Sequence, residues 1–330
     1  MRNAGMIQKI LFGLMGVLAT VLLASFLFTQ WKAREIARQH PPQGVFADVD
    51  GARIHYTDTK PASEALGTIA LIHGASGNEA DLRLALGERL AAAGYRVISI
   101  DRPGHGWSAR EEETSTPDIQ ARQIRQALEK AGVKRAVVAG HSLAGALTLQ
   151  LALDHADLVE GVVLIAPVTH PWPGGVAAYY QLTAMPVAGP IFANTVVMPL
   201  ALSILDTSLK TVFAPQTPPK DYRARTGVEL VLRPETFRAN AIDVSSMYDF
   251  VNREQARYGR ISIPVDIVTG DRDTIVLTHI HSYGSQRDIP GSTLHVMEGV
   301  GHSPHWAKPD EVSVRILAMA EKANGKVAGR

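Results

Sequence analysis

One serine in this sequence is set in a pattern that can turn its hydroxyl into a nucleophile. Ser142 lies in the run Gly140-His141-Ser142-Leu143-Ala144-Gly145, between an expected strand over residues 135–139 and an expected helix over residues 143–155. A serine on such a tight strand-to-helix turn needs small neighbours, and the helix dipole there favours developing negative charge. Glycine and alanine supply the small neighbours here. A serine that merely caps an ordinary helix is the simpler interpretation of this motif alone.

A serine hydroxyl needs a general base, and the base needs a carboxylate to orient it. His302 follows one expected apolar strand, and Asp271 and Asp273 follow another. Because ligands bind where parallel strands end at one edge of a sheet, these side chains are expected near Ser142. The residues alone leave both aspartates open, since either could also form a turn or cap a helix.

Acyl transfer further requires hydrogen-bond donors for the negatively charged oxygen of the transition state. The amide of Leu143, directly after Ser142, is one candidate donor. The second is the amide of Ala75, in a loop where Gly74 lets the backbone approach a substrate closely. The pair His73-Gly74 could also be a plain turn at the end of a strand.

The elements that must position these residues alternate between apolar strands and helices. A hairpin is expected at residues 45–49 and 53–57, around the turn Asp50-Gly51. Further strands are expected at residues 68–72, 95–100, 135–139, 162–165, 265–269 and 294–297, and helices at residues 81–93, 117–131, 143–155 and 309–323. Apolar strands separated by helices predict an α/β fold, with a mainly parallel central sheet covered by helices on both faces.

This alternation stops between about residues 168 and 263. A stretch of that length is too long for a loop without structure of its own, and it is rich in apolar and aromatic residues. We expect a mostly helical cap inserted over the serine. The predicted organisation is an N-terminal anchor and linker at residues 1–40, an α/β core at residues 41–167 and 264–330, and the cap at residues 168–263.

Taken together, the motifs resemble the α/β-hydrolase fold superfamily over roughly residues 45–323. They are Leu71-Ile72-His73-Gly74, Asp101-Arg102-Pro103-Gly104-His105-Gly106-Trp107-Ser108, the Ser142 turn, Gly270–Asp273 and Gly301-His302. The resemblance is to the serine-nucleophile branch with a helical cap, which includes esterases, haloperoxidase-like proteins without a cofactor, and carbon–carbon bond hydrolases. It implies a catalytic triad of Ser142, Asp273 and His302, in the family's order. It also implies oxyanion donors at Ala75 and Leu143, with support from His73, Gly74, Gly140 and His141.

The expected function is therefore that of a serine hydrolase, which cleaves a small and mainly apolar carboxylic ester or lactone through an acyl-enzyme. A serine at this turn argues against epoxide hydrolases and haloalkane dehalogenases, whose relatives have an aspartate there. Carbon–carbon bond hydrolysis is the alternative reaction. A membrane-tethered ligand-binding protein on a hydrolase fold is the alternative outside enzymes, and the presence of all three triad residues argues against it.

Composition narrows the partners of the chain. The net charge is +1 and no basic stripe appears, so nucleic acid is not expected as a partner. The absence of cysteine excludes thiolate chemistry. His279 and His281 lack a carboxylate at ligand spacing, so no metal is expected, and no phosphate-binding glycine motif points to a cofactor. His105 is interpreted as a turn residue, and the sequence predicts no particular protein partner or oligomeric state.

The N-terminus carries a separate signal. Residues 10–29 are apolar and uncharged, and about 20 such residues can cross a bilayer as a helix. Trp31 and the basic residues after it suit the membrane interface. The pattern predicts a single-pass anchor that is not part of the globular fold. A linker at residues 40–44 is expected to join the anchor to that fold. A cleaved signal peptide, and hence a secreted protein, is the alternative, and the charges do not decide the side of the membrane.

Overall fold

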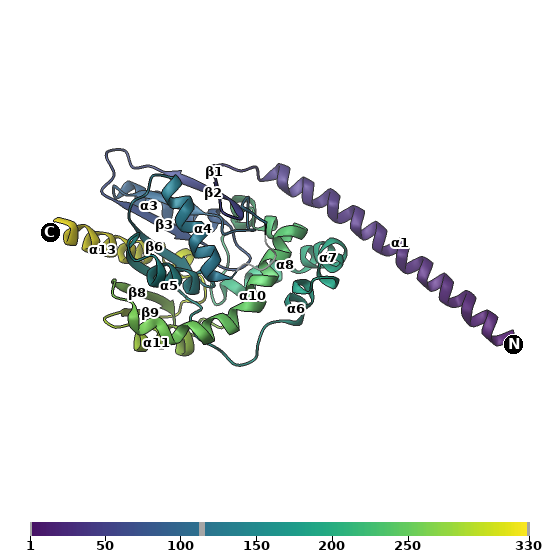
Figure 1. The fold of residues 1–330 in the computed structure, drawn as a ribbon. Coiled ribbons are helices and arrows are strands. Elements are labelled where there is room, and N and C mark those ends of the chain that lie inside the picture. Colours follow the sequence, from purple (N-terminus) through teal and green to yellow (C-terminus); the bar gives the residue numbers. More distant parts are fainter. Residues whose placement is uncertain (1, 112–115, 329–330) are drawn as a thin grey trace.

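The computed structural model describes residues 2–111 and 116–328, and a twisted sheet lies at the centre of the body (Figure 1). Its nine strands have the order β1-β2-β4-β3-β6-β7-β8-β9, with β5 paired to β2. The bounds are β1 (Val45–Val49), β2 (Ala52–Thr59), β3 (Thr68–Ile72), β4 (Arg96–Ile100), β5 (Ala109–Arg110), β6 (Ala136–His141), β7 (Val159–Ile165), β8 (Val265–Gly270) and β9 (Thr293–Met297). Pairing is parallel from β4 to β9 and antiparallel around β2. The predicted fold class, with its antiparallel start, is confirmed.

Helices cover both faces of this sheet, because strands that are apolar on both sides must bury both. On one face, Leu86 and Leu90 pack with Ile316 against the sheet, and on the other Ile124 and Leu147 do so. The helices concerned are α2 (Glu79–Leu82), η1 (Arg83–Gly87), α3 (Glu88–Ala92) and α13 (Pro309–Ala328) on the first face, and α4 (Pro117–Lys130) and α5 (Ala144–Asp154) on the second. Two further helices, α11 (Thr278–Asp288) and α12 (Pro304–Ala307), flank β9.

The prediction of a single helix over residues 81–93 is wrong in detail. The segment begins earlier, at α2, because the side chain of Asn78 accepts a hydrogen bond from the amide of Ala80 and caps the helix. A π-helical turn, η1, then interrupts it before α3 begins. Gly87 ends this turn, but a single glycine inside an apolar helical pattern does not distinguish this arrangement from one continuous helix.

Between β7 and β8 the chain is mostly helical, as expected. The elements are α6 (Ala178–Ala184), α7 (Ala188–Phe192), η2 (Ala193–Val197), α8 (Met198–Phe213), α9 (Tyr222–Thr226), η3 (Val228–Leu232), α10 (Pro234–Glu254) and η4 (Gln255–Arg260). We propose that residues 168–263 are the inserted cap, and we use the name cap for this segment below. The long helix α10 runs beside the α/β body, while α6, α7 and α8 lie toward α1 (Figure 1).

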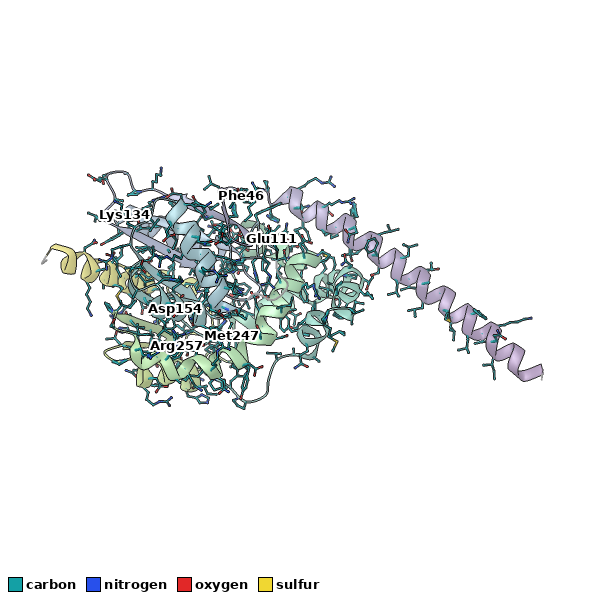
Figure 2. All side chains as sticks on the ribbon, viewed as in Figure 1. Phe46, Glu111, Lys134, Asp154, Met247 and Arg257 are labelled. Atoms are coloured by element: carbon teal, nitrogen blue, oxygen red, sulfur yellow. The ribbon has the colours of Figure 1, made fainter. Side chains whose placement is uncertain are left out.

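Helix α1 (Arg2–Gln39) is long and projects away from the body (Figure 1). Its side chains stand clear of the rest of the molecule along the outer part (Figure 2), and the apolar window of Gly5–Gln39 has a mean hydropathy of 2.5 with none of it buried. By length and composition alone this stretch could cross a membrane. A second stretch, Ala188–Phe213, passes the same test but is 33% buried.

The inner part of α1 corrects one expectation. Thr29 and Ile36 are buried, and Ile36 belongs to a hydrophobic cluster with Met198 and Leu205 of the cap. Gln30 donates a hydrogen bond to Asn194, at 2.8 Å. The prediction that the N-terminal segment stands apart from the globular part is therefore wrong for its last turns, because their apolar side chains are covered by the cap.

Candidate active site

Ser142 lies between β6 and α5, on a backbone that few side chains adopt. Its φ angle is +55°, a left-handed conformation that costs free energy for a residue with a side chain. The turn is held from three sides: the Ser142 amide donates to Ile165, and its carbonyl accepts from Gly145 and Val168 at 2.8 and 2.9 Å. A Cβ on Gly140 would collide with the side chain of Thr148, so this position requires glycine. This is the geometry of a nucleophile turn.

Two further predicted residues form a chain of contacts that begins at Ser142. His302 Nε2 lies 3.0 Å from Ser142 Oγ, and His302 Nδ1 lies 2.8 Å from Asp273 Oδ2. All three side chains are buried. The other carboxylate oxygen, Asp273 Oδ1, accepts hydrogen bonds from the amides of Ile275 and Val276, both at 2.9 Å. These amides fix the carboxylate, so that His302 donates from Nδ1 and presents a free lone pair on Nε2 to the serine.

The rival carboxylate lies elsewhere. Asp271 Oδ1 accepts a hydrogen bond from the amide of Gly299, at 2.7 Å, and its side chain is 37% exposed. It therefore stabilises the turn after β9, whereas Asp273 contacts His302. Since both residues follow β8 within a few positions, only the path of the backbone separates their roles.

The loop after β3 approaches the serine closely. A Cβ on Gly74 would lie 2.8 Å from Ser142 Cβ and 3.1 Å from the carbonyl oxygen of His141, so only glycine allows this approach. Ala75 follows and lines the cavity above Ser142. Leu143 stands just before α5, where the amides of the first turn lack intrahelical partners. The backbones of both predicted donor residues thus lie next to the serine.

A cap residue that sequence reasoning missed holds this loop. Asn240, buried on α10, accepts a hydrogen bond from the amide of Ser76 at 2.7 Å and donates one to Ser76 Oγ at 3.0 Å. Ser76 itself has a φ of +56°. Asn240 therefore fixes the residue after Ala75, and no motif around it in the sequence signals that contact.

The two predicted supporting histidines are buried and neutral. His73 Nδ1 donates to the carbonyl of Gly74 at 2.8 Å, and its Nε2 accepts from the amide of Arg102 at 3.0 Å. Burial and the nearby Arg102 lower the pKa of His73 to about 3. His141 donates from Nε2 to the carbonyl of His302, at 2.9 Å, and burial lowers its pKa well below the usual value. Both side chains position the loops that carry the reactive groups.

A cavity of about 390 Å³ extends from Ser142 and His302 into the cap. This volume is within the range of about 300–1,000 Å³ that is typical of small-molecule sites. Most of the cap side chains that line it are apolar or aromatic: Tyr179, Tyr180, Phe192, Val197, Leu200, Ala201, Ile204, Leu205, Leu209, Val212, Phe213, Tyr222, Val228, Val231, Leu232 and Phe237. Among the described residues of the lining there is no Lys or Arg, and one carboxylate, Asp81.

Asp81 belongs to a buried network beside the cavity. Its Oδ1 accepts hydrogen bonds from Tyr222 at 3.0 Å and Trp306 at 2.8 Å, and its Oδ2 lies 3.2 Å from His305 Nε2. Burial opposes ionisation of Asp81, but the contact with His305 and the hydrogen bond from Trp306 outweigh it and lower its pKa. The network therefore holds a charged carboxylate whose two oxygens already have partners.

Asp81, His141 and His305 also offer ligand atoms within 4.8 Å of one another, a spacing that could hold a metal ion. The sequence gives no hint of this cluster, because its members are far apart in the chain. The expectation of no metal stays a prediction. His281, singled out in the sequence, instead accepts hydrogen bonds at Nδ1 from the amides of Thr169 and His170, both at 3.2 Å.

Buried charges fasten the cap to the core. Asp243 on α10 accepts hydrogen bonds from Arg102 at 2.7 Å and from Arg110 at 2.6 Å. His105 lies in the same cluster, where its Nδ1 contacts the carbonyl of Pro103 at 3.2 Å. His105 is thus a loop residue near the site, away from the serine, as the sequence interpretation expected.

Comparison with known proteins identifies the family. The family model of the alpha/beta hydrolase fold matches residues 67–309. The chain belongs to the α/β-hydrolase family. It is 37% identical over 123 residues to the dihydrolipoyllysine-residue acetyltransferase component of the acetoin cleaving system of Cupriavidus necator, a match that covers 37% of this chain and 32% of that protein.

Two longer similarities cover most of the chain. A 2-hydroxy-6-oxononadienedioate/2-hydroxy-6-oxononatrienedioate hydrolase of a Pseudomonas species is 25% identical over 235 residues, covering 68% of this chain and 77% of that protein. The solved structure of a bacterial membrane phospholipase A is similar with a TM-score of 0.66 and 21% identity, covering 98% of this chain and 99% of that one. At this identity the structural likeness shows the fold alone.

Proposed function

We propose that this α/β hydrolase cleaves carboxylic esters or lactones with a mainly apolar acyl group, through an acyl-enzyme on Ser142. The observation that carries the proposal is the pair of contacts that joins Ser142, His302 and Asp273 at the floor of an apolar cavity. A hydroxyl, an imidazole and a carboxylate in this order form the unit that activates a serine.

The reaction proceeds in two halves. His302 Nε2 takes the proton of Ser142 as Oγ attacks the carbonyl carbon, and the amides of Ala75 and Leu143 stabilise the oxyanion. His302 then protonates the departing alcohol oxygen, which leaves the acyl group on Ser142. In the second half, His302 takes a proton from water, the hydroxide attacks the acyl carbon, and Ser142 leaves with its proton restored. Asp273 holds the imidazole in the tautomer that both halves need.

The nucleophile is tested with a fluorophosphonate probe and with p-nitrophenyl butyrate. The wild-type chain should be labelled and should hydrolyse the ester, and Ser142→Ala should do neither. Ser245→Ala, which changes a serine on α10 outside the cavity lining, is the matched control and should behave as wild type. Equal labelling of Ser142→Ala and wild type would contradict the mechanism.

Carbon–carbon bond hydrolysis is the second candidate, favoured by the similarity to the Pseudomonas hydrolase. The substrate in that enzyme's name is a dicarboxylate. Two carboxylates would need cationic partners if buried, and the described lining of this cavity contains a carboxylate but no Lys or Arg. A neutral ester is therefore the better fit. Faster turnover of a dianionic substrate than of butyrate esters would reverse this ranking.

We further propose that α1 anchors the enzyme in a membrane, which makes the lipid bilayer a partner through residues 10–29. The support is its length, its mean hydropathy of 2.5 and the exposure of that window. The full chain should stay with the membrane fraction after a carbonate wash and keep its N-terminus. A mature N-terminus near Ser25 or Gln30 would establish a cleaved signal peptide instead.

A further inference from the structure

The cap carries an exposed apolar surface beside α1. On α7 and the residue before it, Ile191 is 58% exposed and Val187 is 79% exposed. On η2 and α8, Val196, Leu200 and Ile204 follow one another at four-residue spacing and are 37%, 53% and 48% exposed. We call these five residues the cap patch. No Asp, Glu, Lys or Arg occurs between Glu160 and Asp206, so the patch lacks the charges that usually cover a helix facing water.

Contacts with α1 set the height of this patch relative to the proposed anchor. Ser25 donates a hydrogen bond to the carbonyl of Thr195, and Gln30 contacts Asn194. Ser25 stands four residues before the end of the apolar run at residues 10–29, which is about 6 Å along a helix that rises about 1.5 Å per residue. If residues 10–29 cross the bilayer, η2 lies at the boundary between headgroups and acyl chains. Figure 1 shows α7 and α8 on the side of the body from which α1 projects.

The cavity reaches this same surface. Leu200 and Ile204 line the cavity above Ser142, yet about half of each side chain is exposed. They therefore form part of its rim, on the helix that also carries the cap patch. The cap side chains behind them are apolar, and a rim of this kind gives an acyl chain a continuous apolar path from a lipid phase to the serine.

From these observations we infer that the cap patch is embedded in the surface of the bilayer that α1 anchors in, and that the cavity takes its substrate from that bilayer. The substrate class is then an acyl ester of a membrane-resident amphiphile, with the acyl chain entering past Leu200 and Ile204 and the polar head remaining at the interface. The inference rests on the proposed ester hydrolysis and anchorage, and it names the source of the substrate. An apolar face of this kind binds the interface in proportion to the area that it buries.

Depth measurements test the placement. The chain has no cysteine, so single substitutions allow specific labelling with an environment-sensitive fluorophore. The full-length protein, reconstituted in phosphatidylcholine vesicles, carries the label at Leu18→Cys on α1, Ile191→Cys on the cap patch, or Val314→Cys, an exposed site on α13. Lipids with a nitroxide near the headgroup end of the acyl chain should quench the label at Ile191→Cys. Lipids with a nitroxide near the end of the chain should quench the label at Leu18→Cys, in the middle of the span, and neither lipid should quench the label at Val314→Cys.

The outcomes separate the two proposals. Quenching at Leu18→Cys without quenching at Ile191→Cys overturns the embedded patch and leaves the anchor intact. Absence of quenching at both positions overturns the anchor as well. Disulfide-linked dimers through Ile191→Cys, again without quenching, would assign the patch to a second copy of the chain and overturn the inference.

Kinetics test the source of the substrate. The double variant Val187→Asp/Ile191→Asp changes only residues outside the cavity lining. Its rate on water-dissolved p-nitrophenyl butyrate should match wild type, while its rate on a long-chain acyl ester held in vesicles should fall about tenfold or more, because carboxylates resist entry into the interface. Val314→Asp is the matched control. If the double variant hydrolyses the ester in vesicles at the wild-type rate, the inference is overturned. If the wild-type protein does not hydrolyse p-nitrophenyl butyrate, the proposed ester chemistry is overturned instead.

Discussion

The floor and the roof of the cavity are built on different principles. On the floor, at the edge of the sheet, each polar side chain of the triad has a specific partner at hydrogen-bond distance. Glycines occupy positions where a Cβ would collide with a neighbouring atom. The roof, supplied by the cap, lines the space above the serine mainly with aliphatic and aromatic side chains. Chemistry needs atoms at fixed positions, whereas apolar selection needs only shape and area. Changes to the floor should therefore abolish turnover, and changes to the roof should alter only the preferred substrate.

The largest expected effect tests whether a single carboxylate oxygen on the floor of the cavity controls the rate of hydrolysis. Asp273→Asn should lower kcat for p-nitrophenyl butyrate about ten-thousand-fold, because an amide no longer holds His302 in the working tautomer. Asp271→Asn, two residues earlier and hydrogen-bonded to Gly299, is the matched control and should stay within about threefold of wild type. The reverse ranking would show that the turn after β8 orients the other carboxylate toward the histidine in solution.

The same contrast explains how far the sequence could predict the structure. Ser142, His302 and the Gly270–Asp273 turn lie in short motifs next to strands, so their order and spacing were enough to predict that they meet. Asn240 and Asp81 lie in no motif, and their contacts depend on how α10 and α2 pack across many residues. No short motif in the sequence carries that information.

The inner turns of α1 show a different limit. The apolar run that predicts a membrane span also contains Thr29, and Ile36 lies among basic residues that suggest a linker or headgroup contact. Both are buried against the cap. Hydropathy reports that a residue prefers an apolar environment, but it does not distinguish lipid from a protein surface.

The junction between the floor and the roof should become less stable as the pH falls. His281 on α11 accepts two backbone hydrogen bonds from the first residues of the cap, and burial lowers its pKa to about 4. The unfolded histidine, with a pKa of about 6.5, binds a proton that the folded one rejects. Its contribution to stability is therefore full above pH 6.5 and is lost as the pH falls toward 4, by up to about 3 kcal/mol.

Urea unfolding between pH 7.5 and pH 4.5 measures this loss. His281→Gln, whose amide oxygen can accept the same hydrogen bonds, should flatten the pH dependence of the unfolding free energy. His279→Gln changes an exposed neighbour in the same helix, whose charge is a smaller cause of the lowered pKa than burial is, and should flatten the pH dependence much less. An equal slope in all three proteins would mean that other groups carry the acid sensitivity of the junction.

Close packing on the floor should make a single methyl group costly. In Gly74→Ala, the new Cβ would lie 2.8 Å from Ser142 Cβ, so the loop must move away from the serine. We expect a loss of about 1–3 kcal/mol in unfolding free energy, together with a fall in kcat as Ala75 shifts. Gly77→Ala is the control in the same loop, because its Cβ would come no closer than 3.4 Å to His73. Equal losses in both variants would show that the loop is generally intolerant rather than closely fitted at Gly74.

The smallest effect belongs to the roof. Ala201 on α8 is half-buried and lines the cavity, so Ala201→Leu places three more carbons where an acyl chain would lie. Each methylene that loses its place costs about 0.8 kcal/mol of binding. Displacement of one or two methylenes should lower kcat/KM by up to roughly tenfold for the longest esters accepted and leave it unchanged for acetate. Ala178→Leu, at an exposed position on α6 outside the lining, should leave the whole chain-length profile unaltered. If Ala201→Leu instead lowered kcat equally for acetate and for long-chain esters, the roof would be acting on the reacting atoms, and the separation of floor from roof would fail.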